Sequence, residues 1–148
     1  MILLSIYPKH VRSILKGVKR FEFRKISLKK SALKNRFIIV YETTPTNSIR
    51  LVLKTGKIKE DNIHNLWKNF GKYSGIPKEY FLNYYSSRHT RGIAIEIKKV
   101  FKLKRPISLL KIRKNYPQFA QPQNLYLIND EKYPLLYKKI IKQLPRVC

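Results

Sequence analysis

The sequence is poor in acidic residues and in cysteine, and it has no long apolar run. It has 148 residues, with only 8 Asp and Glu against 33 Lys and Arg, so the formal net charge is +25. Its single cysteine, Cys148, excludes intrachain disulfides and thiolate metal clusters, and it favours a reducing, cytoplasmic compartment. The longest apolar run, Phe37 to Tyr41, is far shorter than the roughly 18 residues that cross a bilayer. The first seven residues lack the features of a secretory signal, so we expect neither export nor membrane insertion.

Metal-ligand spacing is also missing. His10, His64 and His89 lie far apart in the sequence, and no carboxylate or thiol cluster accompanies them. We therefore expect each histidine to be an ordinary surface or core residue. The sequence predicts no metal and no cofactor.

The excess of positive charge favours a polyanionic partner. A charge of +25 is far more than solubility requires, and nucleic acid is the polyanion that basic proteins most often bind. Lysine richness by itself could reflect an AT-rich coding sequence, because Ile, Asn and Tyr are also abundant. That explanation predicts many glutamates as well, and only six are present.

Hydrophobic periodicity predicts one domain with short strands and helices. The 43% hydrophobic content suits a globular core. Because the pattern lacks regular alternation of strand and helix, it favours an α+β fold, a small β-barrel of five to six strands flanked by short helices, over a doubly wound sheet. The stretch 25–36 shows neither period and is expected to be a loop, whereas 37–41 is apolar throughout and is expected to be a central strand. Asp61 or Asn62 stands where it can cap the helix that follows. The predicted strands cover 1–7, 18–24, 37–41, 49–58, 91–103 and 125–128; the predicted helices cover 9–16, 61–70, 77–85 and 130–144, with a short helix or turn at 106–110.

The segment Gly17 to Lys25 contains one carboxylate among several cations. Gly17 ends the preceding helical pattern, and the alternation that follows puts Glu22 and Arg24 on one face of a strand. These two side chains can share a pocket, or they can simply pair in solvent, where the pair contributes little. Strict alternation puts Lys19 on the opposite face, so Lys19 joins them only if the chain bends just after Gly17.

Several segments, in this order, resemble the activating signal cointegrator homology (ASCH) domain of the PUA-like superfamily. No single segment is specific, but their collinear order over about 125 residues is. The segments are Ile2 to Pro8, Ile14 to Arg24, Val40 to Pro45, Leu66-Trp67, Ser74 to Ile76, Glu79 to Phe81, Gly92 to Ile97, Arg105 to Leu109 and Pro122 to Leu127.

The resemblance implies a domain over 1–129. The tail lies outside the resemblance, and its helical spacing predicts a basic C-terminal helix over 130–148, packed on the domain or extending from it. The resemblance also implies a cleft marked by the family signature Gly-x-Lys-x-x-x-x-Arg, which Gly17, Lys19 and Arg24 match. Proteins with this domain are linked to RNA binding and RNA processing.

One branch of the family resembles amidohydrolases that deacetylate N4-acetylcytidine with a lysine, a threonine nucleophile and a glutamate. In this sequence Lys19 matches the lysine, Glu22 occupies the nucleophile position, and the later glutamate falls near Ser74. The family's glycine after the turn is also replaced, by Ile49 to Val52. Because a carboxylate cannot form the usual ester intermediate, we expect little deacetylation. Glu22 could still act as a base for water, or it could only form an ion pair that organises the cleft.

The sequence therefore predicts a nucleic-acid-binding domain, most simply an RNA-binding one. Hydrolysis of RNA or of a modified nucleoside stays an alternative, as does regulation of transcription or RNA processing through a protein partner. Tyr41, Tyr73, Tyr84, Tyr85 and Tyr126 are candidates for base stacking. The helical spacing of Tyr80 and Tyr84, however, favours a core position for both. On the family segments and the basic stretch, the predicted pocket consists of Lys19, Glu22, Arg24, Tyr41, Thr43, Thr44 and Gln123, with Lys19 and Glu22 as the catalytic candidates in an enzyme.

Overall fold

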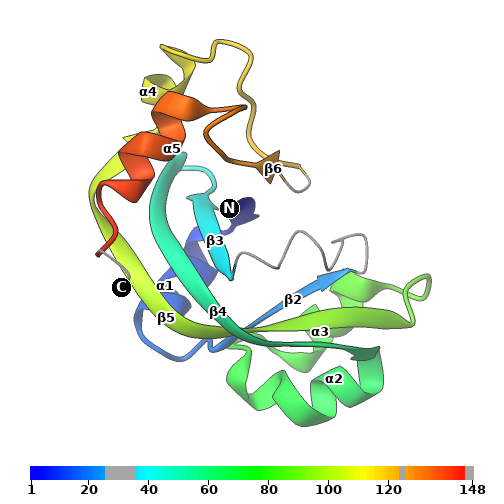
Figure 1. Ribbon diagram of the computed structural model, residues 1–148. Coiled ribbons are helices and arrows are strands. Elements are labelled where there is room, and N and C mark those ends of the chain that lie inside the picture. Colours follow the sequence, from blue (N-terminus) through cyan, green and yellow to red (C-terminus); the bar gives the residue numbers. More distant parts are fainter. Residues whose placement is uncertain (26–35, 124–125, 146–148) are drawn as a thin grey trace.

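The computed structural model describes residues 1–25, 36–123 and 126–145, and it shows one curled sheet (Figure 1). The sheet has six strands in the order β2-β5-β4-β3-β1-β6, and β1 pairs with β3 in parallel, whereas every other pairing is antiparallel. The predicted α+β fold with a small barrel is confirmed, in the form of a half-barrel. The strands are β1 (Ile2–Ile6), β2 (Phe21–Lys25), β3 (Phe37–Glu42), β4 (Ser48–Asn62), β5 (Arg91–Ser108) and β6 (Tyr126–Leu127).

Short helices cover the sheet. α2 begins where Asn62 accepts a hydrogen bond from the backbone N–H of Asn65, as its capping position predicts. Pro8 stands in the first turn of α1, where its missing N–H costs nothing. The helices are α1 (Pro8–Leu15), α2 (Ile63–Phe70), the 3-10 turn η2 (Gly71–Tyr73), α3 (Lys78–Tyr85), α4 (Leu109–Arg113) and α5 (Pro134–Ile141).

The curl comes from the two longest strands, β4 and β5, which bend across the whole molecule (Figure 1). Their pairing shifts register between Lys54 and Thr55 and again before Ile58, and such bulges increase strand twist. In one half of this long β4–β5 pair, β4 therefore also pairs with β3. In the other half, β5 also pairs with β2. α2 and α3 lie against that second half (Figure 1).

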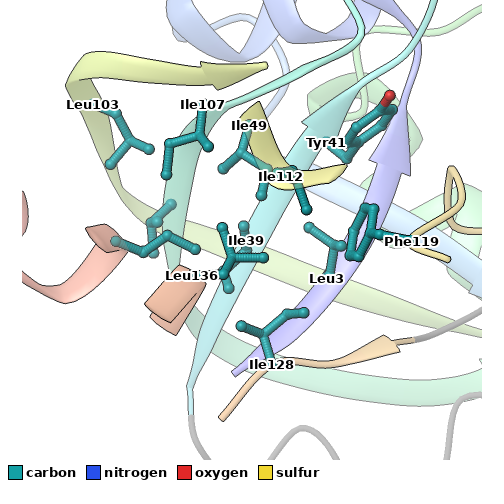
Figure 2. Packing of buried hydrophobic residues seen from close by; sticks show 12 residues of the cluster. Leu3, Ile39, Tyr41, Ile49, Leu103, Ile107, Ile112, Phe119, Ile128 and Leu136 are labelled. Carbon is teal, nitrogen blue, oxygen red and sulfur yellow. The ribbon is translucent and has the colours of Figure 1, made fainter. Parts of the chain in front are cut away.

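Buried side chains fill both faces of the curled sheet. Val11 and Ile14 of α1 pack on one face, against residues of β1, β3, β4 and β5. On the other face Ile112 of α4 and Leu136 of α5 pack against the same sheet (Figure 2). A third cluster joins α2 and α3 to β2 and β5 and contains Phe23, Leu66, Phe81, Tyr85 and Ala94. Because β3 has buried residues on both faces, its prediction as a central strand is confirmed.

A few of the predicted element boundaries differ from those in the structure. The short helix or turn expected at 106–110 is wrong in its first half, because β5 continues to Ser108 before α4 begins at Leu109. Ile107, at 5% exposure, still pairs with Ile49 there, and this burial outweighs the helix-favouring position after Pro106. Residues 26–35, most of the predicted basic loop, lie outside the described residues, as do Leu125 of the last predicted strand and Cys148.

The C-terminal segment docks on the sheet. Leu136 and Ile140 of α5 are buried beside Leu103 and Ile128. The division of the chain at residue 129 stays a prediction. In the part of the chain that the structure describes, no helix has the length and apolar character that a bilayer-spanning helix requires.

Candidate functional site

A pocket of about 350 Å³ opens between α1, α3, β2 and the end of β1. It brings together segments that are far apart in the sequence, because β2 lies at one edge of the sheet and the segment 121–123 closes the other side. Its lining combines charged, hydroxyl and aromatic groups. The lining residues are Ser5, Ile6, Tyr7, His10, Lys19, Glu22, Phe23, Arg24, Thr43, Ile76, Tyr80, Tyr84, Gln121, Pro122 and Gln123.

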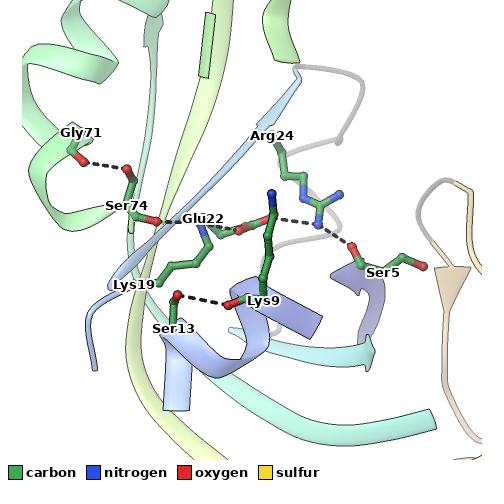
Figure 3. Close-up of polar contacts among 8 residues, drawn as sticks. All are labelled: Ser5, Lys9, Ser13, Lys19, Glu22, Arg24, Gly71 and Ser74. Atoms are coloured by element: carbon green, nitrogen blue, oxygen red, sulfur yellow. Dashed lines mark hydrogen bonds and ion pairs between the residues drawn. The ribbon is translucent and has the colours of Figure 1, made fainter. Parts of the chain in front are cut away.

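Three charged side chains meet in the wall of this pocket (Figure 3). Lys19 Nζ lies 3.0 Å from Glu22 Oε2, and Arg24 Nη2 lies 2.9 Å from Glu22 Oε1. Alternation along β2 explains why Glu22 and Arg24 share a face. Lys19 joins them because Gly17 has a φ of 74° and regular strand geometry begins only at Phe21. The bend after Gly17 on which the trio depends is therefore present.

The position of the trio fixes the charge of Glu22. Burial in the pocket wall by itself would raise the pKa of Glu22, but the charges of Lys19 and Arg24 outweigh burial and lower it. Glu22 is 8% exposed and Lys19 only 3%, so water screens their attraction weakly. Since each carboxylate oxygen already accepts from a cation, Glu22 is an ionised structural partner and a weak base.

Neighbouring backbone carbonyls hold the two cations. Lys19 Nζ donates to Ser74 O at 3.0 Å, and the Ser74 hydroxyl in turn donates to Gly71 O (Figure 3). Arg24 Nη2 donates to Ser5 O at 2.9 Å. Tyr85 donates its hydroxyl to Arg24 O, which fixes the strand that carries the guanidinium. An ammonium has three N–H groups, and the described residues engage two of those of Lys19, through Glu22 and Ser74, which leaves one N–H for a ligand.

Three buried polar atoms of the pocket have no hydrogen-bond partner among the described residues. They are His10 Nε2, Arg24 Nε and Thr43 Oγ1. Buried polar atoms are nearly always paired in folded proteins, because an unpaired one costs about 1–3 kcal/mol. Three unpaired atoms around one cavity indicate a place for a polar ligand that donates and accepts hydrogen bonds.

His10 is the residue that sequence reasoning missed. It stands in the first turn of α1, directly after β1, and its ring contacts those of Tyr7 and Tyr80. Burial and the charge of Lys19 lower its pKa below the usual 6.5, although Glu22 opposes the shift. His10 is therefore neutral at pH 7. Its position one turn from the end of a predicted strand was the one available signal.

Aromatic rings also line the pocket. Tyr80 was expected in the core, but it lines the pocket, and Lys9 Nζ lies 4.8 Å from its ring centroid. Tyr84, a stacking candidate whose spacing also favoured the core, lines the pocket too, with Lys25 Nζ 5.1 Å from its ring. A cation beside a ring provides a phosphate contact next to a stacking surface.

The remaining predicted residues divide between pocket and core. Thr43 and Gln123 line the pocket. Tyr41 is fully buried in the core on the far face of the sheet (Figure 2), because β3 is central and both of its faces are covered. Thr44 is exposed on the turn after β3, where its hydroxyl contacts Asn47, so it does not line the pocket.

The other stacking candidates lie elsewhere. Tyr85 is fully buried in the cluster between α3 and β5, so it cannot stack on a base. Tyr73 lies outside the pocket, where its ring contacts Arg20, and Tyr126 packs against Phe119. Across the described ranges, no group of three or more His, Cys, Asp or Glu side chains is arranged to hold a metal ion.

Comparison with known proteins supports the sequence resemblance. No protein-family model matches the chain. A curated ASCH domain-containing ribonuclease from Zymomonas mobilis is 24% identical over 129 residues, which cover 87% of this chain and 84% of the relative. These values place the similarity along most of both chains.

Solved structures share the fold. The crystal structure of ASCH from Zymomonas mobilis superposes with a TM-score of 0.80 at 22% identity and covers 95% of this chain and 93% of that chain. The N-terminal domain of Staphylothermus marinus McrB gives a TM-score of 0.58 at 14% identity over 96% of this chain and 93% of that domain. The resemblance to the ASCH domain is confirmed, and the chain has the ASCH fold.

Proposed function

We propose that this ASCH-fold protein binds single-stranded RNA and accepts one unpaired nucleotide in the pocket beside Lys19, Glu22 and Arg24. The observation that carries the proposal is a set of three buried polar atoms around one cavity that find no partner in the described part of the chain. A nucleotide supplies both donors and acceptors along its base edge and ribose, and an unpaired base is free to enter a pocket.

The charges around the pocket support a phosphate-bearing ligand. Within the residues that the structure describes, one N–H of Lys19 and the Nε of Arg24 have no acceptor, while Glu22 offsets only part of the positive charge of these two side chains. Lys9 and Lys25 add positive charge beside the rings of Tyr80 and Tyr84, which line the pocket. The similarity to a protein named a ribonuclease agrees with RNA as the polyanion. We also propose that the protein acts in the cytoplasm. A protein partner in RNA processing or transcription stays a prediction.

Fluorescence anisotropy with a labelled single-stranded RNA tests this proposal. We expect Arg24→Ala to weaken binding at least tenfold, because it removes the unpartnered Nε from the pocket. The matched control is Lys114→Ala, which removes one exposed positive charge at the end of α4. The affinity of Lys114→Ala for the RNA should fall less than about threefold, because a surface cation contributes at most one long-range attraction to a phosphate.

Arg24 also pairs with Glu22, so thermal melting must accompany the titrations. Binding is then compared at a temperature where both variants are folded. Equal losses of RNA affinity in Arg24→Ala and Lys114→Ala would contradict a defined pocket. Diffuse charge attraction would then be the explanation for binding. A DNA strand of the same sequence that binds as tightly as the RNA would contradict the preference for RNA.

Cleavage of the bound RNA is a second candidate function. The relative named a ribonuclease favours it, and so does a neutral imidazole in a pocket that also holds two cations. Such a site contains an acceptor for a proton and groups that stabilise negative charge.

A further inference from the structure

We propose that His10 is the general base of an RNA-cleaving site in this pocket and that its Nε2 takes the proton from a ribose 2′-hydroxyl. This inference rests on the proposed RNA binding and assigns the chemistry of that same site. It replaces the sequence-based assignment of Glu22 as the base.

The other titratable groups of the pocket are poorly suited to accept a proton. Both oxygens of Glu22 are held by Lys19 and Arg24, and its pKa is lowered, so the carboxylate is a weak base. Burial raises the pKa of Tyr80 and of Tyr84, so both phenols keep their protons at neutral pH. Lys19 Nζ already donates to the Glu22 carboxylate and to Ser74 O, so it is engaged as a hydrogen-bond donor.

His10 has the properties that a base requires. Its Nε2 is buried at the pocket with no hydrogen-bond partner among the described residues, so nothing there competes for the lone pair. The groups that face it are Tyr7 and Lys9 from its own segment, Tyr80 from α3, and the charged trio of Lys19, Glu22 and Arg24 from the β2 side. Burial and the three cations favour the neutral ring, which agrees with a base that works near pH 7.

The step balances as an internal phosphoryl transfer. The 2′-hydroxyl gives its proton to His10 Nε2, and the 2′-oxygen forms a bond to the adjacent phosphorus. The bond from phosphorus to the 5′-oxygen of the next nucleotide then breaks, and that oxygen takes a proton from water. The hydroxide that remains takes the proton from His10 Nε2, so the ring returns to its neutral form. The products are a 2′,3′-cyclic phosphate and a 5′-hydroxyl end. Lys19 and Arg24 stabilise the additional negative charge on the phosphoryl oxygens as the new bond forms.

The test compares His10→Gln with the wild type in single-turnover cleavage of a short single-stranded RNA. Glutamine keeps a polar group near the Nε2 position but cannot take up a proton. We expect the cleavage rate to fall by about 10²- to 10⁴-fold, the usual contribution of a general base. The dissociation constant for the RNA should change less than threefold. His64→Gln, on an exposed position of α2, is the matched control and should cleave at the wild-type rate.

Two further measurements use the unaltered protein, so the inference stays testable if His10→Gln is poorly folded. A substrate with a single 2′-deoxyribose at the cleavage position should bind but not be cut. The cleavage rate should fall as pH decreases, with a midpoint below 6.5, because protonated His10 cannot act as a base.

The outcomes separate this inference from the proposed function. RNA binding without cleavage, or cleavage that is unchanged in His10→Gln, would overturn the assignment of His10 and leave RNA binding intact. Products with a 5′-phosphate would also overturn it, because they require attack by water. Absence of RNA binding would overturn both proposals.

Discussion

Replacement of Glu22 by glutamine tests the charged trio most directly. The substitution keeps the shape of the side chain but removes the negative charge that lies 3.0 Å from Lys19 and 2.9 Å from Arg24. Lys19 is only 3% exposed, so its ammonium then stays buried with no opposite charge beside it. The free energy of unfolding should therefore decrease.

The magnitude follows from the geometry. Removal of one partner from a buried ion pair typically costs about 3–5 kcal/mol. We expect about 3 kcal/mol for Glu22→Gln, because the amide oxygen can still accept from one cation and Lys19 keeps its bond to Ser74 O. A folded domain with about 5–15 kcal/mol of stability survives this loss. Lys19→Met in the Glu22→Gln background should restore part of the stability, since it removes the buried unpaired charge.

Urea unfolding at several pH values measures the effect. Because the folded protein lowers the pKa of Glu22, the carboxylate contributes stability above its usual pKa of 4.5, and the contribution disappears as pH falls through the lowered value. The difference in free energy of unfolding between wild type and Glu22→Gln should therefore have its full value at pH 7 and become smaller well below pH 4.5. Glu131→Gln, at an exposed position, is the control and should change stability by less than about 0.5 kcal/mol. A difference below about 1 kcal/mol at pH 7, or one that persists unchanged at low pH, would refute the reasoning.

Three other outcomes are expected. RNA affinity should fall with salt at a log-log slope near −3.5 if about five phosphates of a single strand are neutralised, and a slope of zero in titrations from 50 mM salt upwards would contradict phosphate contacts. Purified protein should release little or no cytidine from N4-acetylcytidine, because Glu22 replaces the threonine nucleophile; chromatography showing turnover near 1 per second, lost in Glu22→Gln, would reverse this expectation. Gly92→Ala should destabilise the fold by about 1–3 kcal/mol in urea unfolding, because the added Cβ would overlap the Tyr85 hydroxyl that donates to Arg24 O; an unchanged midpoint would show that the ring moves aside freely.

Local patterns determined most of the fold. Alternation placed Glu22 and Arg24 on one face, and periodicity with capping residues located the helices, because these signals depend on neighbours within a few positions. The apolar run in β3 indicated a central strand for the same reason. Pattern alone could not show how far β5 extends, since cross-strand pairs such as Ile49 with Ile107 hold it to Ser108.

Residue identity also determined the charge and the ASCH resemblance, whereas the site required tertiary structure. Lys19 reaches Glu22 only through the turn at Gly17, and the carbonyl that holds its ammonium comes from Ser74, 55 positions away. Tyr41, predicted at the pocket, is buried on the other face of the sheet. His10 has an ordinary sequence context, and its place in the pocket depends on how α1 docks beside β2 and α3. A pocket is made by segments that meet through packing, and the packing energy depends on the whole fold and is not contained in any local pattern.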